Sequence, residues 1–278
     1  MRAGLVSRTD IPNALAVSGR ILGHLKERGV EASVETDTAL ALGIRDGNTE
    51  LSELECDFMV TVGGDGTILR AAMEMKNPST PILGVNMGRR GFLCEAVAPE
   101  AEWALDKVIA GEYTVEDSLK VSGMCVGTGE RFPDALNEVL VASSLPSKML
   151  LLGLNVDGEH ITDVQADAVM VATPAGSTAY NMSAGGSVVA PDVSALSLTA
   201  VCPYSYFRSL VIPKVSVVTV ELLKPRSEAM AIIDGRAYVA LKPRSKVECR
   251  LSPNVTRFIR FRSFYNRIQK RIMTIQSP

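Results

Sequence analysis

A carboxylate set in a glycine-rich loop is the feature of this chain best suited to chemistry. Residues 60–70 read VTVGGDGTILR, so that Gly63, Gly64 and Gly66 surround Asp65. The pattern predicts a buried strand that runs through the loop into a helix, whose free N–H groups and positive dipole end favour phosphate. The glycines would let the backbone approach such a ligand closely. A carboxylate beside bound phosphates is repelled by them, so Asp65 needs a compensating role.

Two chemical roles fit Asp65. It could accept a proton from a hydroxyl nucleophile, or hold Mg²⁺ against the phosphates. The structural alternative is an N-cap in which the Asp65 carboxylate satisfies the free amides of its own helix. Arg70, one turn into that helix, is a candidate phosphate ligand. The loop has neither the Gly-Lys-Ser/Thr of a Walker A motif nor the GxGxxG fingerprint, which removes the common ATPases and dehydrogenases.

A second glycine loop follows the next predicted strand. Residues 84–93 read GVNMGRRGFL and add Asn86, Arg89 and Arg90. Two such loops at the ends of neighbouring parallel strands favour one shared crevice. Taken alone, the stretch is equally typical of a strand-to-helix turn with solvated arginines.

A third cluster lies farther along, in residues 166–186. A predicted strand ends in TPAGST and leads into a run of small residues, which we expect to expose backbone and hydroxyl donors. Tyr180 offers a flat face for a base. Asn137 and Glu138 form a polar pair inside a predicted strand over 135–141, where a buried carboxamide could read a base edge or a ribose. On an edge strand the same pair would carry no function.

The hydrophobic pattern predicts two domains that position these residues. Strands over 3–7, 31–35, 58–62 and 81–85 alternate with helices over 11–28 and 68–76, which indicates a Rossmann-like α/β domain with a parallel sheet over 1–112. From 113 to 255 the pattern becomes one of short strands. The strands predicted there cover 119–126, 134–142, 149–156, 168–172, 215–222, 229–233 and 237–241, with hairpin turns at Asp157-Gly158 and Asp234-Gly235. Residues 256–278, strand-like and then helical, are expected to return and complete the first domain.

Composition narrows the function classes. The 278 residues include 29 basic and 31 acidic side chains, and the net charge of −2 does not favour nucleic acid as a partner. The charge is uneven, because residues 241–278 hold ten Lys/Arg and one acid, and we expect these cations to meet carboxylates of the acidic first domain.

The cysteines and histidines favour neither a zinc site nor a histidine triad. The five cysteines are scattered, and the two histidines are predicted to lie on the surface. No run is long enough to span a membrane and no signal peptide is recognisable, so cytoplasmic residence is expected.

The ordered set of motifs resembles the NAD kinase family. Its members here are GGDGT at 63–67, NMGRRGFL at 86–93, LNE at 136–138, AD at 166–167, TPAGSTAY at 173–180 and SAGG at 183–186. The tail RFRSF at 260–264 is similar to the C-terminal segment of the family. Lipid kinases and phosphofructokinases share the GGDG loop, and the TPAGSTAY stretch separates the NAD kinases from them.

The resemblance implies transfer of a phosphoryl group from ATP or inorganic polyphosphate to the 2′-hydroxyl of the adenosine ribose of NAD. Asp65 would be the general base, and Mg²⁺ or another divalent cation would arrive with the nucleotide, without a metal site made by the protein. The family commonly forms homodimers or homotetramers, and no membrane partner is implied. The residues implied to bind NAD or phosphate are Gly63, Gly64, Gly66, Thr67, Arg70, Asn86, Asn137, Glu138, Lys148, Gln165, Asp167, Ala175, Thr178, Ala179, Tyr180 and Ser183.

Within that set the resemblance implies separate tasks. The loop amides and Thr67 would cradle diphosphate, and Asn137 and Glu138 would contact adenosine, with Ala175 bordering the adenine. Asp167 and Ala179 would receive the nicotinamide carboxamide. Thr178, Tyr180 and Ser183 would line a cleft between the domains, whereas Lys148 and Arg70 are phosphate candidates by position and charge.

Two positions depart from the family pattern. Tyr204 stands where many members have a histidine, and Arg236 follows Asp234-Gly235 where glutamine is frequent. Two other functions stay open at this point: a lipid or sugar kinase of the same loop class, and a dinucleotide sensor without catalysis. A phosphorylation assay with NAD against diacylglycerol separates the first, and NAD binding without NADP formation would indicate the second.

Overall fold

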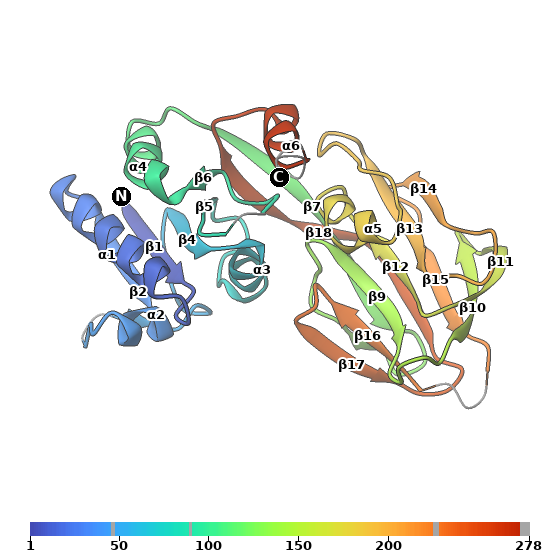
Figure 1. Cartoon of the computed structure of the whole chain (residues 1–278). Helices are drawn as coiled ribbons and strands as arrows, with labels where there is room; N and C mark the ends of the chain where they lie inside the picture. The colour runs from blue at the N-terminus through green and yellow to red at the C-terminus, as the bar shows by residue number, and fades with distance from the viewer. Residues whose placement is uncertain (46–47, 89–90, 225–227, 273–278) are drawn as a thin grey trace. The chain divides into compact units, whose positions relative to one another are not determined.

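The computed structural model describes residues 1–45, 48–88, 91–224 and 228–272. The backbone divides into two compact units (Figure 1): unit 1 comprises Met1–Asp117 with Thr256–Pro278, and unit 2 comprises Ser118–Val255. The predicted combination of an α/β domain and a β domain is confirmed. The sequence pattern changes at residue 112, whereas the backbone units part at Asp117, inside β7 (Thr114–Cys125).

Unit 1 is built on a parallel sheet. Its strands lie in the order β3, β2, β1, β4, β5, and the last residues of β18 continue the parallel arrangement through Phe258 beside Ile82. The short strand β6 also pairs with β5. The bounds are β1 (Arg2–Ser7), β2 (Glu31–Glu35), β3 (Asn48–Thr49), β4 (Phe58–Gly63), β5 (Ile82–Asn86), β6 (Ala96–Val97) and β18 (Lys246–Arg260).

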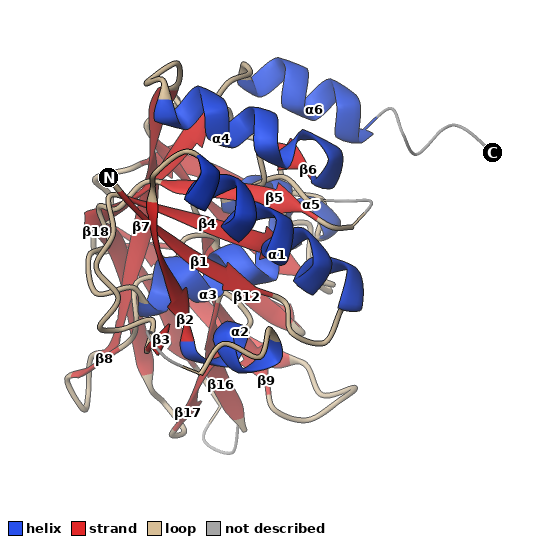
Figure 2. Cartoon of the chain, turned by 90° about the vertical axis from the view of Figure 1, so that its left-hand side faces the viewer, coloured by secondary structure: helices blue, strands red, loops and turns tan. Residues whose placement is uncertain are grey.

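Helices cover both faces of this sheet. Phe58, Val60 and Val62 of β4 share one hydrophobic core with α1 and α4, which lie over the strands in Figure 2. The opposite face carries α3, because a Cβ on Gly84 of β5 would lie 2.7 Å from Cδ1 of Ile68. The helices are α1 (Pro12–Glu27), α2 (Thr36–Ala41), α3 (Asp65–Glu74), α4 (Ala101–Ile109) and α6 (Phe264–Ile272), with a 3₁₀ turn η1 (Ala98–Glu100).

The sequence explains the ends and the face of α1. Pro12 stands in the first turn, where its missing N–H costs nothing, and Gly29 beyond the last turn adopts φ +69°. Ala14, Ile21 and Leu25 are fully buried along one face. Unit 1 also contains α2 and α4, which were not among the elements that the pattern predicted.

Unit 2 is antiparallel throughout its described pairings. One sheet has the order β14, β13, β12, β9, β16, β17, and the second series is β11, β10, β15, β18, with β7 beside β18 and β8 beside β7. The bounds are β8 (Glu130–Arg131), β9 (Glu138–Ser143), β10 (Leu150–Val156), β11 (Glu159–Ala166), β12 (Ala168–Ala172), β13 (Ala195–Val201), β14 (Ser209–Pro213), β15 (Val218–Leu222), β16 (Ala229–Ile233) and β17 (Ala237–Leu241). Two short helical turns, η2 (Gly176–Thr178) and α5 (Tyr180–Ser183), follow β12.

Both predicted Asp-Gly turns join neighbouring antiparallel strands. Asp157 and Gly158 have φ of 52° and 85°, and Asp234 and Gly235 have φ of 50° and 65°. Positive φ at both central positions is what a type I′ hairpin turn needs, and Asp-Gly is a preferred pair there.

The prediction that the cations of residues 241–278 meet carboxylates of the first domain is confirmed for the part that belongs to unit 1. Arg257 pairs with Asp117 at 3.2 Å and Arg262 with Glu100 at 2.7 Å. Arg260 and Arg267 both pair with Glu116 and are buried. Earlier in the same stretch Lys246 pairs with Glu221 and Arg250 with Glu248, all within unit 2, so only part of the excess positive charge belongs to the packing of unit 1.

One surface prediction is wrong in part. His160 is exposed, but the side chain of His24 is only 14% exposed and its Nε2 lies 2.7 Å from Asp106 on α4. His24 lies on α1, and because α1 packs beside α4, its side chain faces α4 and not solvent. In the described part of the chain, no helix is long and apolar enough to cross a membrane.

Candidate active site

The Asp65 loop forms where β4 ends and α3 begins. Gly64 is the N-cap residue of α3, and Asp65 is its first helical residue. A side chain on Gly63 would place its Cβ 2.2 Å from Oγ1 of Thr67, so glycine is required there for the turn to close. The Asp65 side chain makes no cap on its own helix, and the N-cap alternative is therefore wrong.

The Asp65 carboxylate instead binds the second glycine loop. Oδ2 accepts a hydrogen bond from the backbone N–H of Phe92 at 2.7 Å, and Oδ1 accepts one from Leu93 at 3.1 Å. Gly91 lies so close that a Cβ there would sit 3.0 Å from Oδ1 of Asp65. Charge-assisted bonds to backbone amides are among the stronger hydrogen bonds, so they fix the orientation of this carboxylate.

The parallel register explains why the two loops meet. Gly63 of β4 lies beside Asn86 of β5, and the N–H of Met87 donates to the carbonyl of Gly63 at 2.7 Å. The predicted neighbourhood of the two loops is thus found within unit 1. Asn86 turns its amide onto Gly88, with both hydrogen bonds at 3.0 Å. Arg89 and Arg90 lie outside the described residues.

Thr67 and Arg70 differ in how fully they are partnered. Oγ1 of Thr67 is buried and has no hydrogen-bond partner among the described residues. An unsatisfied buried hydroxyl at a helix N-terminus is unusual, and it leaves a donor and acceptor for a ligand. The guanidinium of Arg70 already pairs with Glu35 at 3.0 Å and Asp37 at 3.5 Å. Its contact with phosphate stays a prediction and would compete with those ion pairs.

In unit 2 the Asn-Glu pair lies at the start of a central strand. Glu138 opens β9, which runs between β12 and β16, and Asn137 precedes it. Both side chains are buried, so the edge-strand interpretation is wrong. Strand β9 begins later than predicted, because the amides of Leu136, Asn137 and Glu138 donate to the carboxylate of Asp234 instead of to a strand.

Two buried oxygens of this pair have no protein partner in the described chain. They are Oδ1 of Asn137 and Oε2 of Glu138. Burial raises the pKa of Glu138 to about 8, and the nearby Asp234 carboxylate adds to the increase. At neutral pH Glu138 therefore keeps its proton and can donate a hydrogen bond. Acceptor and donor side by side suit the polar edge of a nucleoside.

The loop after β12 uses its hydroxyls differently from what the composition predicted. Ser177 Oγ donates to Pro174 O at 2.6 Å and accepts from the N–H of Val189 at 2.9 Å. Thr173 Oγ1 donates to Leu136 O, and Thr178 Oγ1 donates to Ala175 O at 3.0 Å. These hydroxyls shape the loop instead of facing solvent, since a buried tight turn must satisfy its own carbonyls.

The remaining predicted residues of unit 2 are more accessible. Tyr180 and Ser183 are exposed, Ala175 and Ala179 are partly buried, and Thr178 is buried. Burial raises the pKa of Tyr180, and the neighbouring Cys202, Asp167 and Glu138 raise it further. The exposed residues Lys148, Gln165 and Asp167 complete the predicted set in this unit.

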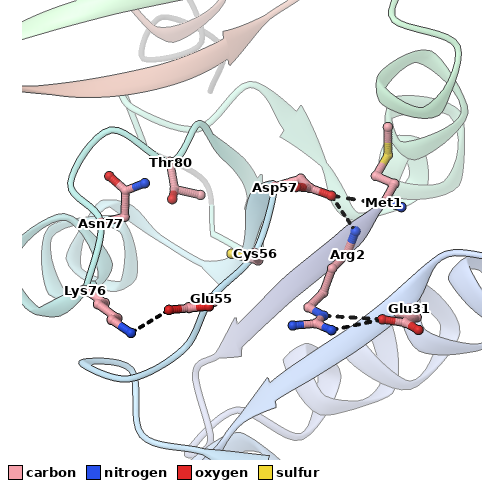
Figure 3. Close-up of a pocket in the computed structure, with 9 residues that line it drawn as sticks. All are labelled: Met1, Arg2, Glu31, Glu55, Cys56, Asp57, Lys76, Asn77 and Thr80. Atoms are coloured by element: carbon pink, nitrogen blue, oxygen red, sulfur yellow. Dashed lines mark hydrogen bonds and ion pairs between the residues drawn. The ribbon is translucent and has the colours of Figure 1, made fainter.

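A pocket of about 680 Å³ lies away from all of these residues (Figure 3). It surrounds the first residues of β1 and β2 and the approach to β4, whereas the glycine loops follow the last residues of β4 and β5. In a parallel sheet these are opposite ends. Its charges pair with one another, Arg2 with Glu31 and Lys76 with Glu55. Nothing in this pocket resembles a reaction centre.

Two contacts of the candidate site were not predicted from the sequence. Asp65 is held by backbone amides, which every residue has, so no residue type marks them. Asp234 was predicted as a turn residue. Its carboxylate also binds the backbone amides of residues 136–138, and this contact depends on the pairing of β16 with β9, which the sequence does not show. The described residues contain no group of three or more side chains suited to hold a metal ion.

Family comparisons agree with this arrangement over most of the chain. The family model of the ATP-NAD kinase N-terminal domain matches residues 5–113, and that of the C-terminal domain matches residues 136–261. The chain belongs to the NAD kinase family. It is therefore a kinase that acts on NAD, which decides against the sensor and against the lipid or sugar kinase.

Individual relatives support the membership. The chain is 36% identical to the NAD kinase of Methanothermobacter thermautotrophicus over 276 residues, which covers 98% of this chain and 96% of that protein. It is 37% identical to the NAD kinase of Pyrococcus abyssi, with 98% and 99% coverage.

Two solved NAD kinase-type structures also match. The NAD kinase of Archaeoglobus fulgidus in complex with ATP is 32% identical, with a TM-score of 0.79 and coverage of 97% of this chain and 98% of that chain. Yeast NADH kinase complexed with NADH has a TM-score of 0.87, with 100% and 89% coverage. At 22% identity, the yeast structure supports the fold alone.

Proposed function

We propose that this kinase transfers a phosphoryl group from ATP or inorganic polyphosphate to the 2′-hydroxyl of the adenosine ribose of NAD. The observation that carries the proposal is the carboxylate of Asp65, which is fixed by the amides of Phe92 and Leu93 at the N-terminus of α3. A carboxylate held beside a phosphate-binding element fits a base that works on a hydroxyl next to phosphates.

Asp65 takes the proton of the ribose hydroxyl as the new O–P bond forms. The bond between the transferred phosphorus and the donor's bridging oxygen breaks, and ADP or shortened polyphosphate leaves. General-base catalysis of this kind contributes about 10²- to 10⁴-fold. Positioning and charge neutralisation around a loose transition state supply the rest.

The phosphate groups are assigned to the loop of unit 1. The amides around Gly63, Gly64 and Gly66 and the unpartnered hydroxyl of Thr67 bind phosphate oxygens. Arg70 is a candidate phosphate ligand in unit 1, and Lys148 is a candidate phosphate ligand in unit 2. Mg²⁺ or another divalent cation would arrive with the nucleotide and neutralise the charge of its phosphates.

The nucleoside groups of NAD are assigned to unit 2. Asn137 and the protonated Glu138 bind the adenosine through the two buried oxygens that the described residues leave unpartnered. Ala175 borders the adenine, and Thr178, Tyr180 and Ser183 contact the dinucleotide. Asp167 and Ala179 receive the nicotinamide carboxamide, and Gln165 is a further candidate contact of NAD.

A coupled assay tests this function. The purified chain is incubated with NAD and either ATP or polyphosphate, and NADP is measured with a dehydrogenase specific for NADP. Formation of NADP is expected, and comparison of the two donors identifies the one that is used. Absence of NADP with both donors, in a folded protein that binds NAD, would contradict the proposal. Light scattering in the same preparation tests the proposed homodimer or homotetramer.

A further inference from the structure

Arg260 connects the returning tail to the peptide that holds Asp65. Its Nη1 donates to the backbone carbonyl of Leu93 at 2.7 Å, and the N–H of the same Leu93 donates to Oδ1 of Asp65 at 3.1 Å. Leu93 therefore binds both residues, Arg260 through its carbonyl and Asp65 through its N–H. All three residues belong to unit 1, although 167 positions separate Leu93 from Arg260.

The guanidinium of Arg260 is itself firmly placed. It is 5% exposed, it binds Glu116 through Nε at 2.9 Å, and its Nη1 lies 3.5 Å from Glu95. It also stacks 4.4 Å from the centre of the Phe258 ring. A planar fork with five donors can bind a carboxylate and a carbonyl at once, which an ammonium group cannot do in the same geometry.

The loop that Arg260 binds has a second anchor to the tail. Oε1 of Glu95 accepts the N–H of Phe261 at 3.0 Å and of Arg262 at 2.9 Å. Nη1 of Arg262 donates to the carbonyl of Glu95 at 3.1 Å. The segment that follows the second glycine loop is thus held at Leu93 and again at Glu95.

We infer that Arg260 is a positioning residue for phosphoryl transfer, which acts by fixing the Leu93 peptide that orients the Asp65 carboxylate. The inference rests on the proposed role of Asp65 as the base. It gives the basic tail a task in the reaction beyond packing. Arg260 makes no contact with a reacting group, so its removal should lower kcat and leave the binding of both substrates intact.

The test is Arg260→Lys, with Arg267→Lys as the matched control. Arg267 is buried to the same degree, 6% exposed, and binds the same carboxylate, with Nη2 2.7 Å from Glu116. Nη1 of Arg267 donates to the carbonyl of Arg262 at 2.9 Å, whereas Nη1 of Arg260 donates to that of Leu93. Each variant keeps a cation among the same acids, and thermal unfolding is measured so that both are assayed while folded.

For Arg260→Lys we expect kcat to fall about 10-fold or more, because small misplacement of a catalytic group is costly, with KM for NAD and for ATP changed by less than about three-fold. Arg267→Lys should keep kcat within about two-fold at a comparable shift in unfolding temperature. Near-normal kcat in Arg260→Lys, or equal losses in both variants, would overturn the inference.

Asp65→Asn is assayed in parallel to separate the two hypotheses. If Asp65→Asn is inactive and Arg260→Lys is normal, the positioning role alone is wrong. If Asp65→Asn is as active as the parent, the proposed base is wrong and the positioning role falls with it.

Discussion

The carboxylate of Asp65 accepts a 2.7 Å hydrogen bond from the backbone N–H of Phe92. This contact joins the end of β4 to the loop that follows β5, so the two glycine-rich stretches form one structure. Asp65 therefore differs from an ordinary N-cap residue, whose side chain would bind the amides of its own helix. The carboxylate is oriented by a segment 27 residues away in the chain.

Gly91→Ala should impair turnover by crowding this carboxylate. The new Cβ would lie 3.0 Å from Oδ1 of Asp65, which forces a shift of a few tenths of an ångström. We expect kcat to fall about 10-fold, since catalysis is sensitive to small misplacements. Steady-state kinetics with saturating NAD and ATP measure it.

Gly23→Ala is the control for that variant. Gly23 lies within α1 with open space where a Cβ would go, and alanine favours helix by about 1 kcal/mol. Its kcat should equal that of the parent chain. A Gly91→Ala enzyme that is fully active would show that the position of Asp65 is not critical.

Glu138 should make the stability of the chain depend on pH. Its pKa is raised from 4.5 to about 8 by burial and by Asp234. As the pH rises from about 4.5 to about 8, the unfolded chain releases a proton that the folded chain keeps, so the free energy of unfolding falls through this window. The contribution between about pH 5 and about pH 7 is of the order of 2 kcal/mol.

Glu138→Gln removes this titration. Its free energy of unfolding, measured with urea across the same pH range, should decline less than that of the parent and exceed it at about pH 8. Glu159→Gln, on the exposed start of β11, serves as the control and should keep the parental slope. An unchanged slope in Glu138→Gln would mean that Glu138 is ionised in the folded chain.

Asp234→Asn should weaken the segment that carries the Asn-Glu pair. The two oxygens of Asp234 accept three backbone N–H groups, and an asparagine would turn an NH₂ group toward one of these donors. A buried donor left without an acceptor costs about 1–3 kcal/mol, and we expect a loss of that size in unfolding free energy together with weaker NAD binding.

Denaturant unfolding and isothermal titration with NAD measure these two effects. Asp192→Asn, at an exposed position before β13, is the control and should change neither. Parental stability and affinity in Asp234→Asn would remove Asp234 from the support of the site.

Much of the fold follows from local pattern. The strands β2, β12, β16 and β17 have the residue ranges that were predicted, and each stands next to a turn or a helix break. The last three are also short runs of apolar, strand-prone residues, whereas β2 reads EASVE. The two Asp-Gly hairpins have a sequence signature of their own. The helix α2 is short, and tertiary contacts decide it more than periodicity does. The helix α4 could have been predicted, because its buried residues Ala101, Ala104, Leu105 and Val108 recur at i, i+3, i+4 and i+7.

The site could be predicted only where side-chain type matters. The glycine loop, Asp65 and the Asn-Glu pair are visible as residues, and the order of the motifs identifies the family. The partners of Asp65 are backbone amides, which no residue type marks. The role of Arg260 depends on which backbone carbonyl its guanidinium binds once the C-terminal segment has returned to unit 1. The hydroxyls of Thr173 and Ser177 look like ligand donors in the sequence, yet the fold uses them to close their own turn.

Asp65→Asn, assayed for NADP formation with NAD and ATP, is the most direct test of Asp65 as the general base. The variant keeps the size of the side chain, but it cannot accept the ribose proton, and its NH₂ group faces the backbone N–H of Phe92 or of Leu93. We predict a loss of kcat of about 10²- to 10⁴-fold with NAD affinity unchanged, and parental activity in Asp57→Asn, which lies at the opposite end of the sheet. Activity of Asp65→Asn close to that of the parent would falsify Asp65 as the base.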